Sequence, residues 1–520
     1  MYTENFKRTV YIFLLSATGF FLPLSVWMLS ALTIALAILW LLTGGPENLV
    51  SGLREKWPVL VFSLLYLVYL AGMITTNDTL SGLGELKNKL PAIAFPFIVG
   101  FSRSLNKREL RIIVTSFIAG VVISSLSGII VKIMAEDNVI FNPRQLSVFI
   151  SHIRLAIMSV LAICISIDYF IISDRRTGPD FLYLISALWL TVFLFMLMSV
   201  TGILIFIVIL TGTIIWLILR SRKLLLKYAL SGILVLILLS AVMVVVISIR
   251  SFYSPGDAYP TPLEPYTSHG NPYWHDTINR DTENGNLVWI YISEDELGSS
   301  WNLRSSLPYD SLDKAGQRLK YTLIRYLTSK GLRKDSEGIS GLAAMDISNV
   351  ENGIANYIYS GDQRIKAWIY EIIWQVDYYL RGGNPSGHSV TQRMEFMKTG
   401  LRIFKRYPLF GAGTGDLAQE IKKQYDLDKS ILDTPYRLEA HNQFVTFLAL
   451  FGLTGFAVII FSFFYPFFRI LRYLDYPAII FFLIIMLSML GEDTLETQTG
   501  ISFFAYFYSL FIFGRNEENI

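Results

Sequence analysis

Cysteine and charged residues are both scarce in this sequence of 520 residues. The single cysteine is Cys164, so no disulfide can form within the chain and any large domain must fold by packing alone. Charged residues make up 16% of the chain, whereas a soluble protein carries about 25%. The net charge is +3, and nothing in its distribution indicates a nucleic-acid partner. The composition is therefore not that of an ordinary soluble protein.

The sequence contains many long apolar runs. Runs of about 18 or more apolar residues are typical of transmembrane helices, so the sequence predicts an all-α polytopic membrane protein with about twelve spans. The expected spans are 9–25, 27–43, 57–74, 91–102, 110–132, 151–172, 182–198, 200–219, 226–249, 442–467, 474–490 and 499–514. Lys7 and Arg8 precede the first span as in a signal peptide, but no small-residue cleavage site follows, so we expect this span to be retained.

The distribution of lysine and arginine predicts the orientation of these spans. With a cytoplasmic N-terminus, the inner loops hold 17 of these residues and the short outer loops hold 4. We therefore expect an N-terminal membrane domain (1–249) with about nine spans and a C-terminal membrane domain (441–520) with about three. The loop domain between them (250–440) is expected to be mostly helical and to lie outside the cytoplasm. Its amphipathic stretch 363–380 predicts a helix that either lies at the membrane interface or packs within the loop domain.

His441 is the first candidate for chemistry. It lies in "RLEAHNQFVTFLALFGLTGF" (437–456), where charged residues give way directly to an apolar span. Of the four histidines expected in the loop region, only His441 adjoins a span, and Asn442 follows it. An imidazole can accept a proton from a hydroxyl near neutral pH. The alternative is an ordinary polar residue at the membrane interface.

Several arginines precede His441 in the sequence. They are Arg364, Arg381, Arg393, Arg402, Arg406 and Arg437. Arginine binds phosphate through a planar fork of donors, so this cluster fits a phosphate or diphosphate carried on a lipid. Arg393 lies between two apolar stretches of its helix, which favours a specific role, whereas Arg402 and Arg406 favour a solvated basic face. Arg154, beside His152 at the outer end of the sixth span, is a further unusual charge.

Two further motifs have competing interpretations. The alternating glycines of "PLFGAGTGD" (408–416) suit an anion-binding loop, but a tight turn that directs the next helix is the favoured interpretation. Glu492, Asp493 and Glu496 form an acidic group that a divalent metal would suit, but we favour solvated acids and no metal site.

The motifs "QRMEFMKTGLRIFKRYPLFGAGTGD" (392–416) and "HNQFVTFLALFGLTGF" (441–456) resemble those of the bacterial O-antigen ligase and polymerase superfamily. The tail "EDTLETQTGISFFAYFYSL" (492–510) is similar to the end of its ligase-like members. This resemblance implies a multi-pass glycosyltransferase of the bacterial inner membrane with its large loop in the periplasm. It implies an inverting, metal-independent transfer without a cofactor. The donor would be a glycan on undecaprenyl diphosphate, among membrane lipids, and the acceptor a sugar hydroxyl of lipid A-core or of another glycan.

The resemblance also implies roles for individual residues. His441 would be the base and Arg393 would bind the diphosphate. Many ligases carry a second arginine after a serine near a span, but this chain has Val200 and Thr201 after Ser199. Arg154 or Arg364 would then replace it, and Arg437 and Asn442 are further candidates for substrate binding.

Other functions remain open at this point. An O-antigen or capsule polymerase and a protein O-oligosaccharyltransferase would use the same residues with a different acceptor. The long loop and the tail favour the ligase. A polysaccharide transporter would need more charge within its spans than Arg154 and Asp168 supply. A metal-dependent glycosyltransferase would need acids in the first outer hairpin, where "FFLPLSVW" has none.

Overall fold

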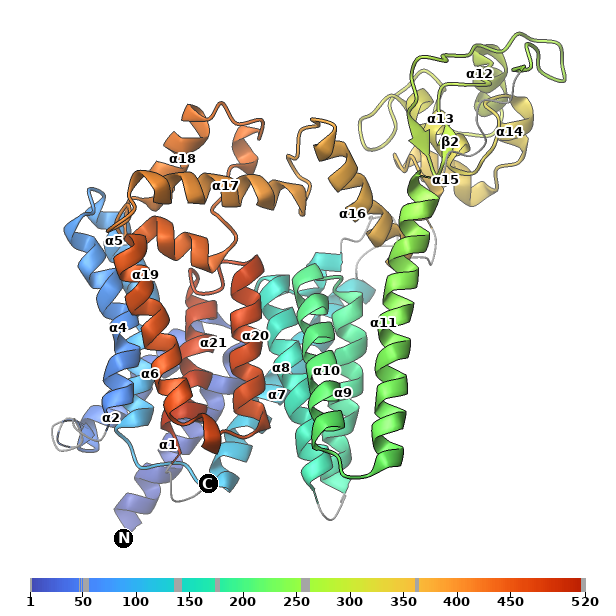
Figure 1. Ribbon diagram of the computed structural model, residues 1–520. Helices are drawn as coiled ribbons and strands as arrows, with labels where there is room; N and C mark the ends of the chain where they lie inside the picture. Colours follow the sequence, from blue (N-terminus) through green and yellow to red (C-terminus); the bar gives the residue numbers. More distant parts are fainter. Residues whose placement is uncertain are drawn as a thin grey trace. The chain divides into compact units, whose positions relative to one another are not determined.

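The protein is helical almost throughout (Figure 1). The structure is a computed structural model, and it describes residues 2–45, 47, 49, 56–134, 143–173, 178–253, 262–360 and 364–515. Among these residues, the strands are the short antiparallel pair β1 (Thr282–Glu283) and β2 (Asn286–Leu287). The described chain forms two compact units, Met1–Arg220 with Gln392–Ile520 and Ser221–Thr391. We call them the membrane unit and the loop unit.

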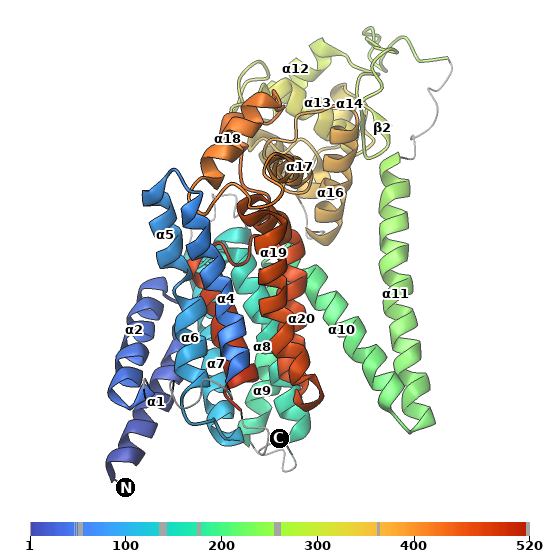
Figure 2. The ribbon, with the colours of Figure 1, turned by 60° about the vertical axis from the view of Figure 1, so that its left-hand side comes forward.

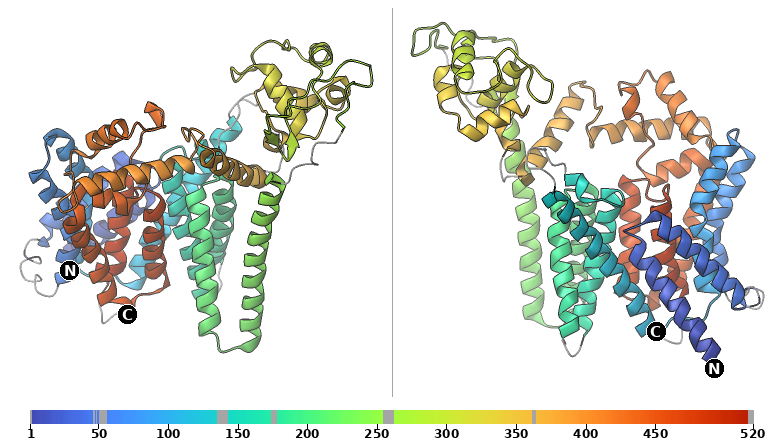
Figure 3. Two further views of the ribbon diagram at one scale, coloured as in Figure 1. Left: turned by 45° about the horizontal axis from the view of Figure 1, so that its top comes forward. Right: turned by 180° about the vertical axis from the view of Figure 1, so that it is seen from behind.

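The membrane unit consists of helices from both ends of the chain. Its first half holds α1 (Tyr2–Phe21), α2 (Val26–Leu42), α4 (Trp57–Ala71), α5 (Thr79–Lys89), α6 (Pro91–Gly100), α7 (Lys107–Met134), α8 (His152–Ile172), α9 (Gly178–Met196) and α10 (Val200–Arg220). Its second half holds α17 (Thr391–Arg406), α18 (Leu417–Leu427), α19 (Gln443–Arg469), α20 (Tyr476–Gly491) and α21 (Gln498–Tyr508), which a π-helical turn (Ser509–Phe513) extends. The two halves interleave, because α19 packs on α4, α21 on α6 and α20 on α8 (Figures 1 and 3).

The helices agree with the predicted spans. Each of the twelve predicted ranges overlaps a helix. Among the residues that the structure describes, six helices are long and apolar enough to cross a membrane: Trp57–Ile74, Lys107–Met134, His152–Ile172, Val200–Arg220, Leu224–Arg250 and Gln443–Arg469. Four shorter apolar helices are Val26–Leu42, Asp180–Met196, Tyr476–Gly491 and Gln498–Phe513. The prediction of an all-α polytopic membrane protein is confirmed, and the number of spans stays a prediction.

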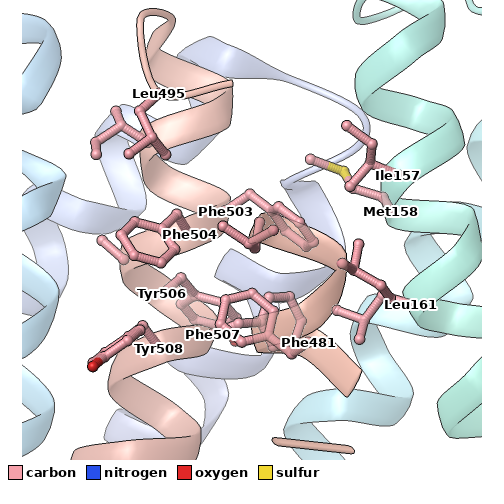
Figure 4. Close-up of a cluster of buried hydrophobic side chains, with 14 of the residues drawn as sticks. Ile157, Met158, Leu161, Phe481, Leu495, Phe503, Phe504, Tyr506, Phe507 and Tyr508 are labelled. Carbon is pink, nitrogen blue, oxygen red and sulfur yellow. The ribbon is translucent and has the colours of Figure 1, made fainter. Parts of the chain in front are cut away.

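Helix α21 forms the centre of the membrane unit (Figure 4). Its residues from Thr499 to Tyr508 are all buried, as expected for a helix that is apolar on every side. Phe503 and Phe507 pack against Phe481 of α20. The hydroxyl of Tyr506 donates to the carbonyl oxygen of Leu15, and that of Tyr508 to Phe463, so both buried phenols have partners. This packing fixes the turn 492–497 that precedes α21.

The glycine-rich segment 408–416 is a packed turn beside a break in α19. Gly452, at φ 61°, interrupts this helix. The amides of Ala412 and Gly413 donate to carbonyls before the break, and Pro408 accepts from Leu453 after it. These backbone groups are therefore engaged by protein, which supports a tight turn rather than an anion-binding loop.

The loop unit contains its own core without a disulfide. Its helices are α11 (Leu224–Tyr253), α12 (Glu294–Asn302), α13 (Leu319–Ser329), α14 (Ser336–Ser340), α15 (Ala344–Glu351) and α16 (Arg364–Leu380). Trp301 of α12, Leu323 and Tyr326 of α13 and Val350 of α15 are fully buried in one apolar cluster. Figure 2 shows α12, α13 and α14 grouped together in this unit. The predicted amphipathic helix 363–380 is present as α16, which contacts α11.

Replacing Gly411 should destabilise the membrane unit. Gly411 has φ 73°, and a Cβ atom there would lie 2.2 Å from the carbonyl carbon of Leu450. The left-handed conformation alone costs an alanine about 1–2 kcal/mol, and the overlap adds to this cost. We expect Gly411→Ala to lower the melting temperature of the detergent-solubilised protein. Gly212→Ala is the control, because a Cβ atom at Gly212 would contact nothing within 4 Å. Equal melting temperatures for both variants would contradict this account of the turn.

Candidate functional site

The start of α19 is fixed by the turn that follows α20. Asp493, in this turn, is 9% exposed. One of its carboxylate oxygens accepts a hydrogen bond from the backbone amide of His441 at 2.8 Å, and the other accepts from the hydroxyl of Thr446 at 2.6 Å. The carboxylate thus joins two segments that are about fifty residues apart in the sequence.

His441 adopts an unusual conformation immediately before α19. Its φ of 47° lies in the left-handed region, which is uncommon for a residue other than glycine. Asn442 caps the helix by accepting hydrogen bonds from the amides of Phe444 and Val445, both at 3.1 Å. The His441 ring stacks on Phe396 of α17, with ring centroids 5.2 Å apart. The position of the imidazole is therefore fixed both by the backbone hydrogen bond to Asp493 and by the ring contact with Phe396.

A carboxylate contacts the imidazole directly. Glu492 Oε2 lies 3.3 Å from His441 Nδ1, and Glu492 Oε1 forms an ion pair with Arg393 Nη2. The Glu492 side chain is 11% exposed, so this contact is largely shielded from water. Because an ionised carboxylate only accepts hydrogen bonds, we assign the imidazole proton to Nδ1. The lone pair is then on Nε2, which is the arrangement of a histidine that acts as a general base.

A second network lies beside this one. Glu496 accepts hydrogen bonds from Lys89 Nζ at 2.7 Å, from the Tyr69 hydroxyl at 2.8 Å and from Gln443 Nε2 at 2.5 Å. Lys89 is 1% exposed, and it also donates to the carbonyl oxygen of Leu495 at 2.9 Å. A buried ion pair is stable only when such hydrogen bonds offset the cost of desolvation. The network links α4 and α5 to α19 and to the turn 492–497.

The prediction that Glu492, Asp493 and Glu496 are solvated is wrong. Glu492 and Asp493 are buried, and each of the three acids has protein partners at the start of α19. The helices α19 and α20 run antiparallel, so the end of one lies beside the start of the other, which the sequence pattern alone did not reveal. Within the described residues there is no group of three or more side chains suited to hold a metal ion.

The other candidate residues are only partly brought together. Asn442 is near the site and donates to the carbonyl oxygen of Leu490 at 2.9 Å. Arg154 lies in the first turn of α8, and its positive charge interacts with the negative charges of Glu492 and Asp493. The buried Nε of Arg154 makes no hydrogen bond to a described residue. Arg437 instead pairs with Asp426 at 2.6 Å, and it also donates to the carbonyl oxygen of Leu432. Arg364 begins α16, and its side chain lies outside the described residues.

Residues 348–460 match the family model described as O-antigen ligase. This segment includes Arg393, the glycine-rich turn and His441. This part of the chain is similar to the O-antigen ligase family. The resemblance that the motifs indicated is thereby confirmed, and the match supports a membrane glycosyltransferase of the ligase or polymerase type. A comparison with curated proteins finds no match.

The site also contains an acid with a raised pKa. Glu439 lies at the surface two residues before His441, yet the surrounding protein partly desolvates its carboxyl group. Desolvation, together with the negative charges of Glu496, Asp493 and Glu85, raises the pKa of Glu439 from 4.5 to about 7. The folded protein therefore binds this proton more tightly than the unfolded chain does.

Neutralising Glu439 should stabilise the protein at alkaline pH. The stability that the raised pKa contributes is present below about pH 4.5 and is lost as the pH rises through 7. We expect Glu439→Gln to have a higher melting temperature than the wild type at pH 8 and a similar one at pH 5. Asp310→Asn, at an exposed position of the loop unit, is the control. A shift of equal size at both pH values would contradict this prediction.

Proposed function

We propose that this protein transfers a glycan from undecaprenyl diphosphate to a sugar hydroxyl of lipid A-core. The observation that carries the proposal is the arrangement of His441, Glu492 and Arg393. Glu492 contacts both His441 Nδ1 and Arg393, which leaves His441 Nε2 available to a substrate. A base and a cation that contact the same carboxylate suit a reaction that removes a proton from one substrate and releases a phosphate from the other.

In the proposed reaction, His441 Nε2 takes the proton of the acceptor hydroxyl. The acceptor oxygen attacks the anomeric carbon of the donor sugar, and the bond from that carbon to the diphosphate oxygen breaks. The bonding electrons leave with undecaprenyl diphosphate, and a single displacement of this kind inverts the anomeric centre. The negative charge of Glu492 stabilises the imidazolium that forms. As the superfamily implies, this route uses neither metal nor cofactor.

Arg393 binds the departing diphosphate in this proposal. The Arg393 side chain is paired with Glu492 but is still 29% exposed, so a substrate phosphate can reach the guanidinium. Arg154 provides the second phosphate contact, because its buried Nε makes no hydrogen bond to a described residue and its charge interacts with the same acids. Asn442 is a further candidate for substrate binding, and so is Arg364. Arg437 stays a further candidate, and in the described structure it pairs with Asp426.

The proposed location is the bacterial inner membrane, with the reaction on its periplasmic face. The excess of lysine and arginine in the expected inner loops supports this orientation. We retain the division into membrane domains 1–249 and 441–520 and a periplasmic loop domain 250–440. A lipid-linked diphosphate lies at the membrane–water boundary, which is the depth expected for a residue that immediately precedes a span.

Removing His441 should abolish glycan transfer. We expect a deletion strain complemented with His441→Ala to lack polymer on lipid A-core and to accumulate polymer on the lipid carrier. A lipopolysaccharide gel and a lipid extract measure the two outcomes. His269→Ala is the matched control, because His269 is an exposed histidine of the loop unit. Core that bears a single repeat would make the protein a polymerase instead, and an unchanged ladder would remove His441 from the mechanism.

Removing the charge of Glu492 should slow the reaction. Loss of an orienting carboxylate costs a catalytic histidine up to about 10⁴-fold in rate, so we expect Glu492→Gln to lower kcat at least tenfold. Glu492→Asp retains the charge and should recover part of the activity. A transfer assay with purified protein gives kcat and KM, and the melting temperature of each variant reports on folding. Wild-type kcat in Glu492→Gln would contradict the proposed role.

A further inference from the structure

The loop unit contains a cleft that the proposed reaction does not use. It lies between the segment 274–294 and the start of α13, and its volume is about 580 Å³. This volume is within the range of about 300–1,000 Å³ that is usual for small-molecule sites. Trp274, Trp289 and Tyr321 line it together with the polar residues Asp276, Asn279 and Lys320.

The aromatic side chains form a preorganised surface. Trp274 is 54% exposed and Tyr321 is 43% exposed, while Trp289 meets the Tyr321 ring edge-on at 6.2 Å. Single exposed aromatic residues need no explanation, but three around one cleft are unusual. The backbone beneath them is paired, because Trp274 exchanges two hydrogen bonds with Ile292 and Asp276 donates to the Trp289 carbonyl oxygen at 2.7 Å. The rings are therefore presented by a fixed backbone.

The polar groups of the cleft carry almost no net charge. Lys320 pairs with Glu294 at 3.7 Å, and Arg325 pairs with Glu283 at 2.6 Å. The cleft therefore offers hydrogen-bonding groups without the surplus of positive charge that a phosphate-rich or anionic lipid ligand would require. Among the described residues, the Tyr321 hydroxyl and the Asn279 side-chain NH₂ have no hydrogen-bond partner, so both can bind a ligand.

We propose that this cleft binds a short stretch of glycan. A sugar ring presents an apolar C–H face, which packs on an aromatic ring, and a rim of hydroxyls, which exchange hydrogen bonds with amide, carboxylate and hydroxyl groups. The cleft combines these two kinds of surface and is nearly neutral. The inference rests on the proposed function, because the ligand is then part of the polymer that the enzyme transfers. The cleft would hold several sugars of that polymer while the reducing end reacts.

The test is binding of an oligosaccharide to the full-length protein in detergent. The probe is the polysaccharide that mild acid releases from the host's own lipopolysaccharide, cut to short oligosaccharides, and saturation-transfer NMR measures the Kd. We expect Trp274→Ala and Tyr321→Ala each to weaken binding at least fivefold. The matched control is Tyr266→Ala, which removes an aromatic residue of the same unit that is 61% exposed and does not line the cleft. Unchanged binding by both cleft variants, with melting temperatures like that of the wild type, would overturn the proposal.

The His441→Ala variant separates this inference from the proposed function. It should bind the oligosaccharide as the wild type does, because the cleft lies within the loop unit. If His441→Ala abolishes transfer but Trp274→Ala and Tyr321→Ala bind normally, only the glycan cleft is wrong. If His441→Ala retains transfer while the cleft variants lose binding, the proposed mechanism is wrong and the binding site remains.

Discussion

The candidate site depends on the hydrogen bonds that Asp493 accepts from the start of α19. The His441 amide donates to Asp493 at 2.8 Å, and the Thr446 hydroxyl donates to it at 2.6 Å. These hydrogen bonds hold His441 at a positive φ. A carboxylate can do this only if its own position is fixed. Burial of α21 on every side fixes it, because the turn 492–497 leads directly into that helix. The aromatic core thus determines where the imidazole lies, although it does not touch it.

Burial of charge beside the site has a cost that its hydrogen bonds offset. Lys89 and Glu496 lose most of their contact with water, and desolvation of such a pair can exceed its Coulomb attraction. Tyr69, Gln443 and the Leu495 carbonyl oxygen supply the missing hydrogen bonds. An apolar contact would hold the helices equally well but would allow them to slide. The network requires each partner at one distance and direction, so it fixes the register of α4, α5 and α19.

The sequence predicts the helices and part of the site. Most of the apolar runs are long enough to predict a helix separately, and His441 and Arg393 stand out because each occurs in a recognisable motif. The partners of His441 do not stand out, because Glu492 and Asp493 are about fifty residues away and meet it only after α19 and α20 pack antiparallel. Arg437 is near His441 in the sequence, which suggested a shared site. The structure adds a partner that the pattern did not predict, because Asp426 of α18 pairs with Arg437.

Glu492 connects the cation and the imidazole that the proposed reaction needs. In the described structure it pairs with the Arg393 guanidinium and contacts the neutral His441 ring at Nδ1. In the proposed reaction, the donor diphosphate carries more negative charge than a carboxylate and so competes for the Arg393 guanidinium. Glu492 would then interact with His441 alone and stabilise the imidazolium that forms on proton transfer. Under this proposal, donor binding and proton transfer to the base are coupled through one side chain.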